Sequence, residues 1–136
     1  MVKREFYGHD TQERGNVRAY SRAVVVEGGR TAYLAGVTSK GPDGEPVTDS
    51  AEAAARAVLD RLGETVELAG GSLADIVTMT VFITDPRYGD DFVRVRGEYF
   101  EEGRYPASAL VTCTALARPG LMMEIQAIAV LDGERS

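Results

Sequence analysis

The chain of 136 residues is long enough for a single domain with its own hydrophobic core, and 44% apolar with 26% charged residues is typical of a folded protein. The net charge of −6 argues against nucleic acid as a partner, because phosphates would meet net repulsion. No apolar run approaches the ~20 residues of a membrane-spanning helix, so no membrane association is expected.

The chain contains one cysteine, Cys113, and one histidine, His9. A single cysteine cannot close an intramolecular disulfide, and charge begins at Lys3 where a signal peptide would be apolar, so we expect a cytoplasmic location. A metal site or a Ser-His-Asp triad would rest on His9 alone, so we predict neither a metal nor a cofactor. We interpret Cys113 as a buried strand residue, since no cationic neighbour is evident to activate it as a nucleophile.

The first part of the chain predicts strands. Residues 20–27 and 31–37 are rich in β-branched and apolar side chains, and the glycine pair at 28–29 predicts a tight turn that joins them as a hairpin. Residues 40–46 concentrate glycine and proline and predict a surface loop. The termini are expected to be the only unfolded parts.

A helix is predicted from an N-cap at Asp49, with Glu52 in the position of a capping box, to the glycines at 70–71. Apolar residues spaced three and four apart form one buried stripe on it: Ala55, Val58, Leu62, Val66 and Ala69.

Residues 76–84 alternate strictly and predict a strand. One side carries Val77, Met79, Val81 and Ile83, and the other carries Thr78, Thr80, Phe82 and Thr84. A second amphipathic helix is predicted over residues 90–102. Strands at 108–116 and 121–131 follow, and the turn residues 117–120 between them favour a second hairpin.

This order of elements predicts an α+β domain in which a mixed sheet carries both helices on one face. Strand 121–131 is apolar at nearly every position, which indicates burial on both sides. In so small a domain the helix-free face would then be covered by other copies of the chain.

Several segments together, spanning residues 19–131, resemble the Rid family, also called YjgF/YER057c/UK114 or L-PSP-like. They are Ala19-Tyr20-Ser21-Arg22-Ala23, Leu34-Ala35-Gly36, residues 69–77 leading to Val81-Phe82-Ile83-Thr84-Asp85, Tyr105-Pro106-Ala107-Ser108, and residues 123–129. The resemblance implies a chorismate-mutase-like fold over residues 1–136, a homotrimer, and a small-molecule pocket at each subunit interface.

The resemblance also implies a chemistry. Family members hydrolyse reactive enamines and imines released by pyridoxal-phosphate enzymes, and an arginine after the Pro-Ala pair holds the substrate carboxylate by a bidentate fork. This chain has Ser108 at that position, which places it in a branch without the arginine and indicates a substrate other than the usual 2-imino acids, or none. One hypothesis is that Arg94 or Arg96 of the second helix replaces the anchor, and the alternative is a solvated helix face.

Glu124 corresponds to the acidic residue that handles the hydrolytic water, since a carboxylate in a partly desolvated cleft can take a proton and return it. Its alternative is a solvent-facing glutamate or a salt bridge between subunits. The implied substrate-binding residues are Tyr20, Ala35, Gly36, Phe92, Arg96, Ala107 and Ser108.

Three of these residues have structural alternatives. Tyr20 could be an amphipathic strand tyrosine, Gly36 a bulge, and Ser108 a cap at a strand start. Ser108 has no histidine base beside it in sequence and is not expected to act as a nucleophile.

Three functions remain open from the sequence: hydrolysis of a small imine or enamine, a non-catalytic trimer that binds a metabolite, and an endoribonuclease activity. The acidic charge balance and the lack of a histidine pair argue against the third.

Overall fold

The computed structural model describes residues 1–8 and 18–133, so the prediction for His9 lies outside the described residues. The elements follow one another as β1 (Lys3–Tyr7), β2 (Ala23–Glu27), β3 (Arg30–Tyr33), β4 (Val37–Thr38), α1 (Ala51–Leu68), β5 (Ile76–Ile83), α2 (Gly89–Tyr99), β6 (Ala107–Thr112) and β7 (Met123–Leu131). Two short 3-10 turns, η2 (Leu73–Asp75) and η3 (Pro86–Tyr88), precede β5 and α2.

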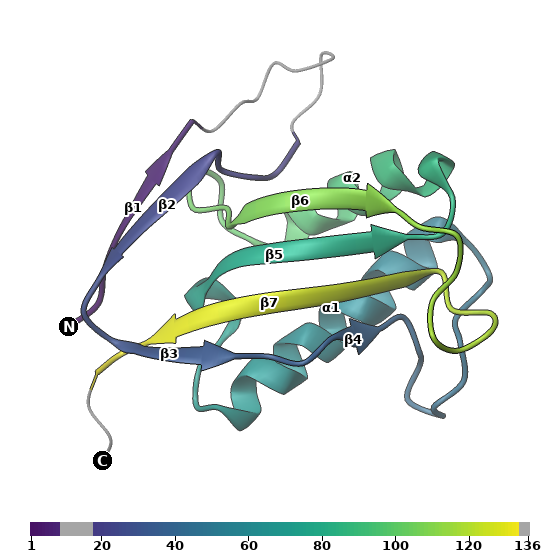
Figure 1. The fold of residues 1–136 in the computed structure, drawn as a ribbon, viewed down its shortest axis with the longest axis horizontal. Coiled ribbons are helices and arrows are strands. Elements are labelled where there is room, and N and C mark those ends of the chain that lie inside the picture. The colour runs from purple at the N-terminus through teal and green to yellow at the C-terminus, as the bar shows by residue number, and fades with distance from the viewer. Residues whose placement is uncertain (9–17, 134–136) are drawn as a thin grey trace.

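The main sheet has the strand order β3-β7-β5-β6, and β4 also pairs with β7. β7 runs antiparallel to β3, β4 and β5, whereas β5 and β6 run parallel to each other. A parallel pair needs a crossover connection, and α2 provides it between β5 and β6. Figure 1 shows α1 and α2 together behind the sheet, which confirms the predicted α+β fold with both helices on one face.

Both predicted hairpins are wrong. β2 pairs with β1 in a separate two-stranded ribbon, and Gly28 and Gly29, with φ of +78° and +84°, turn the chain from this ribbon into the main sheet. β6 and β7 do not pair, because β5 lies between them and pairs with both. Turn residues mark where a chain changes direction, but they do not identify the strands that pair.

The N-terminal strand β1 was not predicted, because its residues are mostly charged or aromatic and the ends were expected to stay unfolded. Arg4 holds it in place: its guanidinium bonds Asp75 at 2.7 Å and the carbonyl of Val130 at 2.6 Å. The ribbon is therefore tied to η2 and to β7.

Helix α1 begins one residue later than predicted. Ser50, not Asp49, is the N-cap, and its Oγ accepts a hydrogen bond from the Ala53 N–H at 3.0 Å. The buried side of the helix contains Ala54, Ala55, Val58, Leu59, Leu62 and Val66, so the predicted stripe is confirmed except for Ala69, which is only partly buried. The helix ends at Leu68 and Gly70 follows with φ of +91°, as the glycine signal predicted.

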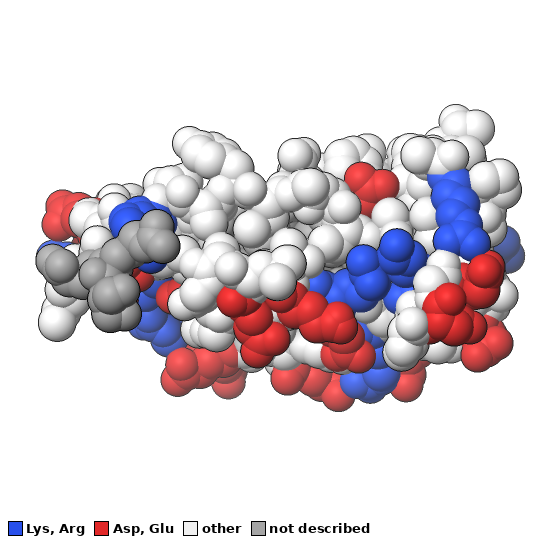
Figure 2. Space-filling model, turned by 90° about the horizontal axis from the view of Figure 1, so that it is seen from below, with Lys and Arg blue, Asp and Glu red and all other residues white. Residues whose placement is uncertain are grey.

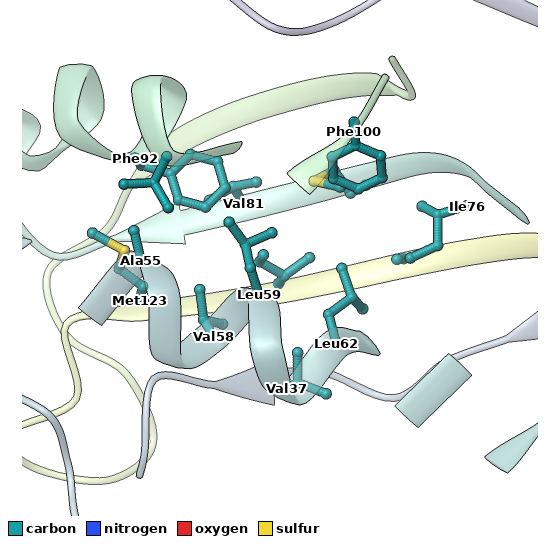
Figure 3. Close-up of a cluster of buried hydrophobic side chains, with 14 of the residues drawn as sticks. Val37, Ala55, Val58, Leu59, Leu62, Ile76, Val81, Phe92, Phe100 and Met123 are labelled. Atoms are coloured by element: carbon teal, nitrogen blue, oxygen red, sulfur yellow. The ribbon is translucent and has the colours of Figure 1, made fainter. Parts of the chain in front are cut away.

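The core lies between the two helices and the inner face of the sheet, as Figure 3 shows for side chains from α1, α2, β5 and β7. Each fully buried leucine or valine in such a layer contributes about 1.5–3 kcal/mol. Met79, Val81 and Ile83 share one side of the strand as predicted, and this side is buried, while a bulge between Ile76 and Thr78 puts Ile76 there in place of Val77. Neither helix in the described ranges has the length and apolar composition that a membrane crossing requires.

The two sides of the molecule differ in charge. Figure 2 views the molecule from below Figure 1, with the helices in its lower half and the helix-free face of the sheet uppermost. Acidic and basic side chains crowd the lower half, and the upper half shows few of them. The helix-free face carries uncharged side chains such as Thr78, Thr80 and Ile128, and beside them Tyr33 is 80% exposed.

Candidate functional site

The first half of the predicted site lies where β6 begins. Ser108 is the second residue of β6 and pairs with Met79 of β5 on the helix side of the sheet. Arg96 reaches it from α2: Nη1 donates a hydrogen bond to Ser108 Oγ at 2.7 Å and lies 3.7 Å from Met79 Sδ. Nη2 donates to the carbonyl of Arg18 at 3.1 Å. The interpretation of Arg96 as part of a solvated helix face is therefore wrong.

Arg96 is a buried cation, with only 2% of its surface exposed. Burial, followed by the nearby charge of Arg18, lowers the pKa of Arg96 to about 10, and Tyr20 and Tyr105 partly oppose this lowering. The side chain still carries its charge at neutral pH. Within residues 1–8 and 18–133, no carboxylate forms an ion pair with Arg96, and its Nε has no acceptor.

Two further predicted residues surround this cation. The Phe92 ring, fully buried one turn earlier on α2, has its centroid 5.1 Å from Arg96 Cζ, in cation–π range. Tyr20 comes close because the next residue, Ser21, bridges to Ala107 at the start of β6 and donates its N–H to the carbonyl of Pro106 at 3.0 Å.

The structure thus brings together five of the predicted residues, and we call this group the arginine cluster. Its members are Tyr20, Phe92, Arg96, Ala107 and Ser108.

The second half of the predicted site lies on β7 and the segment between β3 and β4. Glu124 pairs with Phe82 on one side and with Thr38 of β4 on the other, and its side chain is half-buried. Gly36 lies so close that a Cβ placed on it would collide with Glu124 Oε2. A larger residue at position 36 would force that carboxylate to move. We call Ala35, Gly36 and Glu124 the glutamate group.

Sequence reasoning left open whether Gly36 marks a ligand or a bend. The predicted strand 31–37 is in fact interrupted after Tyr33 and resumes at Val37, so Gly36 lies at a break between β3 and β4. Its close neighbour in the structure is the carboxylate of Glu124. The break confirms the interpretation of Gly36 as a bend, and its role beside a ligand stays a prediction.

One chain does not bring the two halves together. Ser108 shares a row of the sheet with Ala127, two strands away, and Glu124 is three residues further along β7. With strands ~4.8 Å apart and a rise of ~3.3 Å per residue, the two Cα atoms are about 14 Å apart. Ser108 faces the helices, whereas Glu124 alternates with the buried Met123 and Ile125 and faces the other side.

Sequence reasoning missed a shallow pocket of about 220 Å³ on the helix-free face. It is lined by Tyr33, Leu34, Thr78, Met79, Thr80, Gln126, Ala127 and Ile128. Gln126 is two residues from Glu124 on the same side of β7, so the pocket is next to the glutamate group. The alternation of threonines along β5 indicated this face but did not indicate its shape.

Other candidate residues lie apart from both halves. Arg94 is half exposed on the opposite side of α2 and bonds Glu52 and Asp91 at 3.0 Å each, so for it the solvated helix face is correct. Cys113 comes just after β6, is only partly buried, and has its Sγ 3.7 Å from the carbonyl of Ile83. Among the described residues, no three His, Cys, Asp or Glu side chains are grouped as metal ligands would be.

Comparison with known proteins gives one family. The sequence profile described as Endoribonuclease L-PSP matches residues 11–131. Protein DfrA of Myxococcus xanthus is 36% identical over 90% of this chain and 92% of its own. The 2-iminobutanoate/2-iminopropanoate deaminase of Rattus norvegicus is 35% identical over 84% of this chain and 81% of its own.

A solved structure agrees with the sequence matches. The Rid family protein YyfB from Yersinia pestis, of unknown function, superposes with a TM-score of 0.80 at 27% identity, covering 94% of this chain and 98% of that one. The chain therefore belongs to the Endoribonuclease L-PSP family, the same family as the Rid or YjgF proteins that its motifs resemble. The predicted family and the predicted fold are both confirmed.

Proposed function

We propose that this protein hydrolyses the C=N bond of a small, reactive imine or enamine in pockets formed between the subunits of a homotrimer. Family membership supports the reaction class, since relatives at 30–36% identity include proteins named as 2-iminobutanoate/2-iminopropanoate deaminases. The observation that carries the proposal is the carboxylate of Glu124, half-buried on the helix-free face over a glycine that makes room for it.

The division of the site into two halves supports a trimer. In a ring of identical subunits each contact joins two different surfaces of the chain, whereas a two-fold dimer joins a surface to itself. A ring can therefore set the arginine cluster at the β6 edge of one subunit against the glutamate group on the sheet face of the next. The few charges on the helix-free face (Figure 2) and the exposed Tyr33 favour covering of that face by another copy.

The chemistry needs one group that moves protons. As the water oxygen bonds to the carbon of the protonated imine, Glu124 takes one proton from the water, and a neutral carbinolamine results. Glu124 returns that proton to the nitrogen and then takes the proton of the carbinolamine hydroxyl as the C=O bond forms and the C–N bond breaks. Passing this last proton to the released ammonia restores the carboxylate, so one iminium ion and one water give one carbonyl compound and one ammonium ion. An enamine follows the same reaction steps after protonation at carbon has converted it to the protonated imine.

The test is hydrolysis of an imine generated in the assay by an amino-acid oxidase, with ammonia release measured against the spontaneous rate. We expect faster release with the wild-type protein and a loss of at least a hundredfold for Glu124→Gln, which has the same shape but accepts no proton. Glu67→Gln, an exposed change on α1, is the matched control and should keep full activity. A rate that Glu124→Gln leaves unchanged would overturn the role of Glu124.

One alternative has an observation of its own. Ser108 is neutral and the cation behind it is enclosed, which would also suit a trimer that binds a metabolite without turning it over. Tight binding of a 2-oxo acid with no ammonia release from any imine would favour this alternative. Light scattering tests the assembly common to both, with three times the 14.6 kDa chain mass as the expected result.

A further inference from the structure

We infer that Arg96, acting through the hydroxyl of Ser108, makes the pocket selective for ligands that carry a carboxylate group. The inference rests on the proposed function for the kind of molecule that enters the pocket. It assigns the charge of the binding site to a residue of α2, twelve positions before the residue that would contact the ligand.

The first step is the missing counter-ion. Buried charges in proteins are normally paired, because an isolated ion loses its hydration with nothing in return. Arg96 is 2% exposed and remains charged at neutral pH, yet no ion pair reaches it from the described ranges. Its Nε hydrogen also has no acceptor there. A cation in this state attracts an anion from outside these described ranges.

The second step is the route by which that attraction reaches a ligand. Ser108 Oγ accepts the 2.7 Å hydrogen bond from Arg96, so the hydroxyl hydrogen is free to point elsewhere. Its one acceptor within the described chain, the carbonyl of Ala109, is 3.4 Å away, which is long for a hydroxyl donor. A hydroxyl that accepts from a cation becomes a stronger donor. Ser108 is half-buried on an edge strand and can be reached where Arg96 cannot.

The third step is the fit between the two residues. The space on the helix side of Ser108 is filled by the guanidinium of Arg96, so a long cationic side chain at position 108 would meet a like charge. A small hydroxyl residue is what this arrangement accepts. A ligand carboxylate would then be held by one charge-assisted hydrogen bond and by the field of the cation behind it. Arg96 is in this sense a positioning residue, and Ser108 is the contact.

The experiment compares two probes that differ only in charge, 2-oxobutanoate and its neutral amide 2-oxobutanamide, by calorimetric titration of the intact protein. The wild type should bind the carboxylate at least tenfold more tightly than the amide. Arg96→Met should remove most of this preference, and Arg96→Lys should restore part of it. Arg94→Met, on the same helix and exposed, is the matched control and should leave the preference unchanged.

A second variant keeps the test valid if Arg96→Met fails to fold. Ser108→Ala leaves the helix and Arg96 in place and should reduce the carboxylate preference by a similar factor. In the double variant the two losses should not add, because both act through the same hydroxyl. An unchanged ratio of carboxylate to amide affinity in Ser108→Ala would overturn the inference, even if Arg96→Met lowers the melting temperature.

The outcomes also separate this inference from the proposed function. If the protein hydrolyses imines with and without a carboxylate at equal rates and binds both probes alike, the inference fails and the hydrolase remains. If no imine is hydrolysed but the preference for 2-oxobutanoate depends on Arg96 and Ser108, the hydrolase fails and the anion site remains.

Discussion

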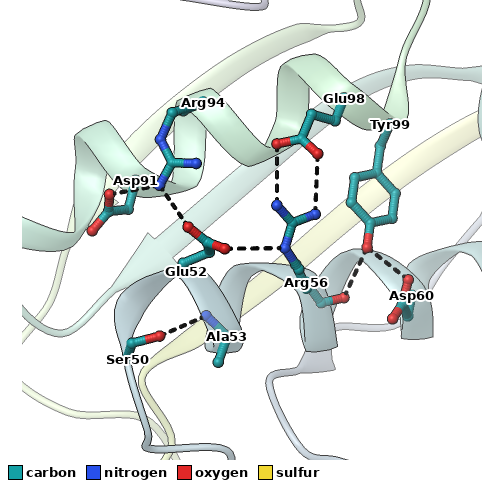
Figure 4. A network of polar contacts seen from close by, with 9 residues as sticks. All are labelled: Ser50, Glu52, Ala53, Arg56, Asp60, Asp91, Arg94, Glu98 and Tyr99. Carbon is teal, nitrogen blue, oxygen red and sulfur yellow. Dashed lines mark hydrogen bonds and ion pairs between the residues drawn. The ribbon is translucent and has the colours of Figure 1, made fainter.

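Arg94 and Arg96 are two residues apart on α2 and have opposite surroundings. Two residues correspond to about 200° around a helix, so the two side chains leave it on opposite sides. On the outer side, Figure 4 shows Arg94 and Arg56 within a network of carboxylates from both helices, where Arg56 bonds Glu98 at 3.1 Å. On the inner side Arg96 meets a serine, a carbonyl and a sulfur atom.

The difference shows what each side of the helix does. Exposed ion pairs contribute little to stability because water and salt screen them, but they satisfy every charge locally. The buried guanidinium of Arg96 is screened by neither water nor salt. No carboxylate in residues 1–8 and 18–133 forms an ion pair with it. The outer network fixes α2 against α1, and the inner side carries the charge that can act on a ligand.

The largest expected effect comes from removing the buried ring of Phe92 on the inner side of α2. This ring is fully buried and lies against the guanidinium of Arg96, so Phe92→Ala should lower the free energy of unfolding by about 3–5 kcal/mol through loss of packing. Urea denaturation followed by circular dichroism measures it. Phe92→Leu is the control that refills most of the space and should lose clearly less. A loss below about 1 kcal/mol for Phe92→Ala would show that the inner side of α2 packs loosely.

The next effect comes from giving the buried Arg96 a carboxylate partner, which the exposed arginines of the outer network already have. Ser108→Asp would place a carboxylate near Arg96 Nη1. Arg96 is already buried without the substitution, so the new ion pair would not add the cost of removing water from the guanidinium. We expect the free energy of unfolding to rise by about 1–3 kcal/mol relative to Ser108→Asn, which has the same shape without charge. Binding of 2-oxobutanoate should be lost in the same variant. An aspartate variant less stable than the asparagine variant would contradict an unbalanced charge at Arg96.

The smallest effect is on the outer side, at Tyr99. Burial, followed by its 2.8 Å hydrogen bond to Asp60, raises the pKa of Tyr99 to about 12. Because the folded state favours the neutral phenol, this contribution to stability is present below the ordinary pKa of 10.0 and is lost as the pH rises through about 12. The tyrosinate absorbance of the wild type minus that of Tyr99→Phe isolates the group. Asp60→Asn should bring the titration back toward 10, and a Tyr99 that already titrates near 10 in the wild type would refute this account.

Local patterns predicted most of the fold. The alternation in residues 76–84 and the apolar stripe of residues 49–69 each follow from one element packed on one face, and both are found almost as expected. Strand pairing was not predictable in the same way. Nothing local in residues 108–131 shows that β5, thirty residues earlier, lies between β6 and β7. The charged residues of β1 do not indicate a strand, since their pairing with β2 decides it.

The sequence predicted which residues belong to the candidate site, but it did not predict how they are arranged. Ser108 and Arg96 were each predicted as site residues. Only the structure, in which α2 packs near the start of β6, shows that Arg96 donates a hydrogen bond to Ser108. The spacing on the helix did hold a signal that was missed: Arg96 is four residues after Phe92 and shares its apolar stripe, whereas Arg94 lies off that stripe. In one chain Glu124 and Ser108 lie apart, so whether they share a pocket depends on the homotrimer that we propose.

The central position of β7 has a consequence for biosynthesis. β3, β4 and β5 all pair with this strand, and the partner residues of β3 and β7 are separated by about a hundred positions. A nascent polypeptide that has grown only as far as β6 holds β3 and β4 with nothing to pair against. The sheet must therefore close after translation has passed residue 131, and such long-range closure is slow. Chaperones would meet this chain with its inner apolar surface still open to water.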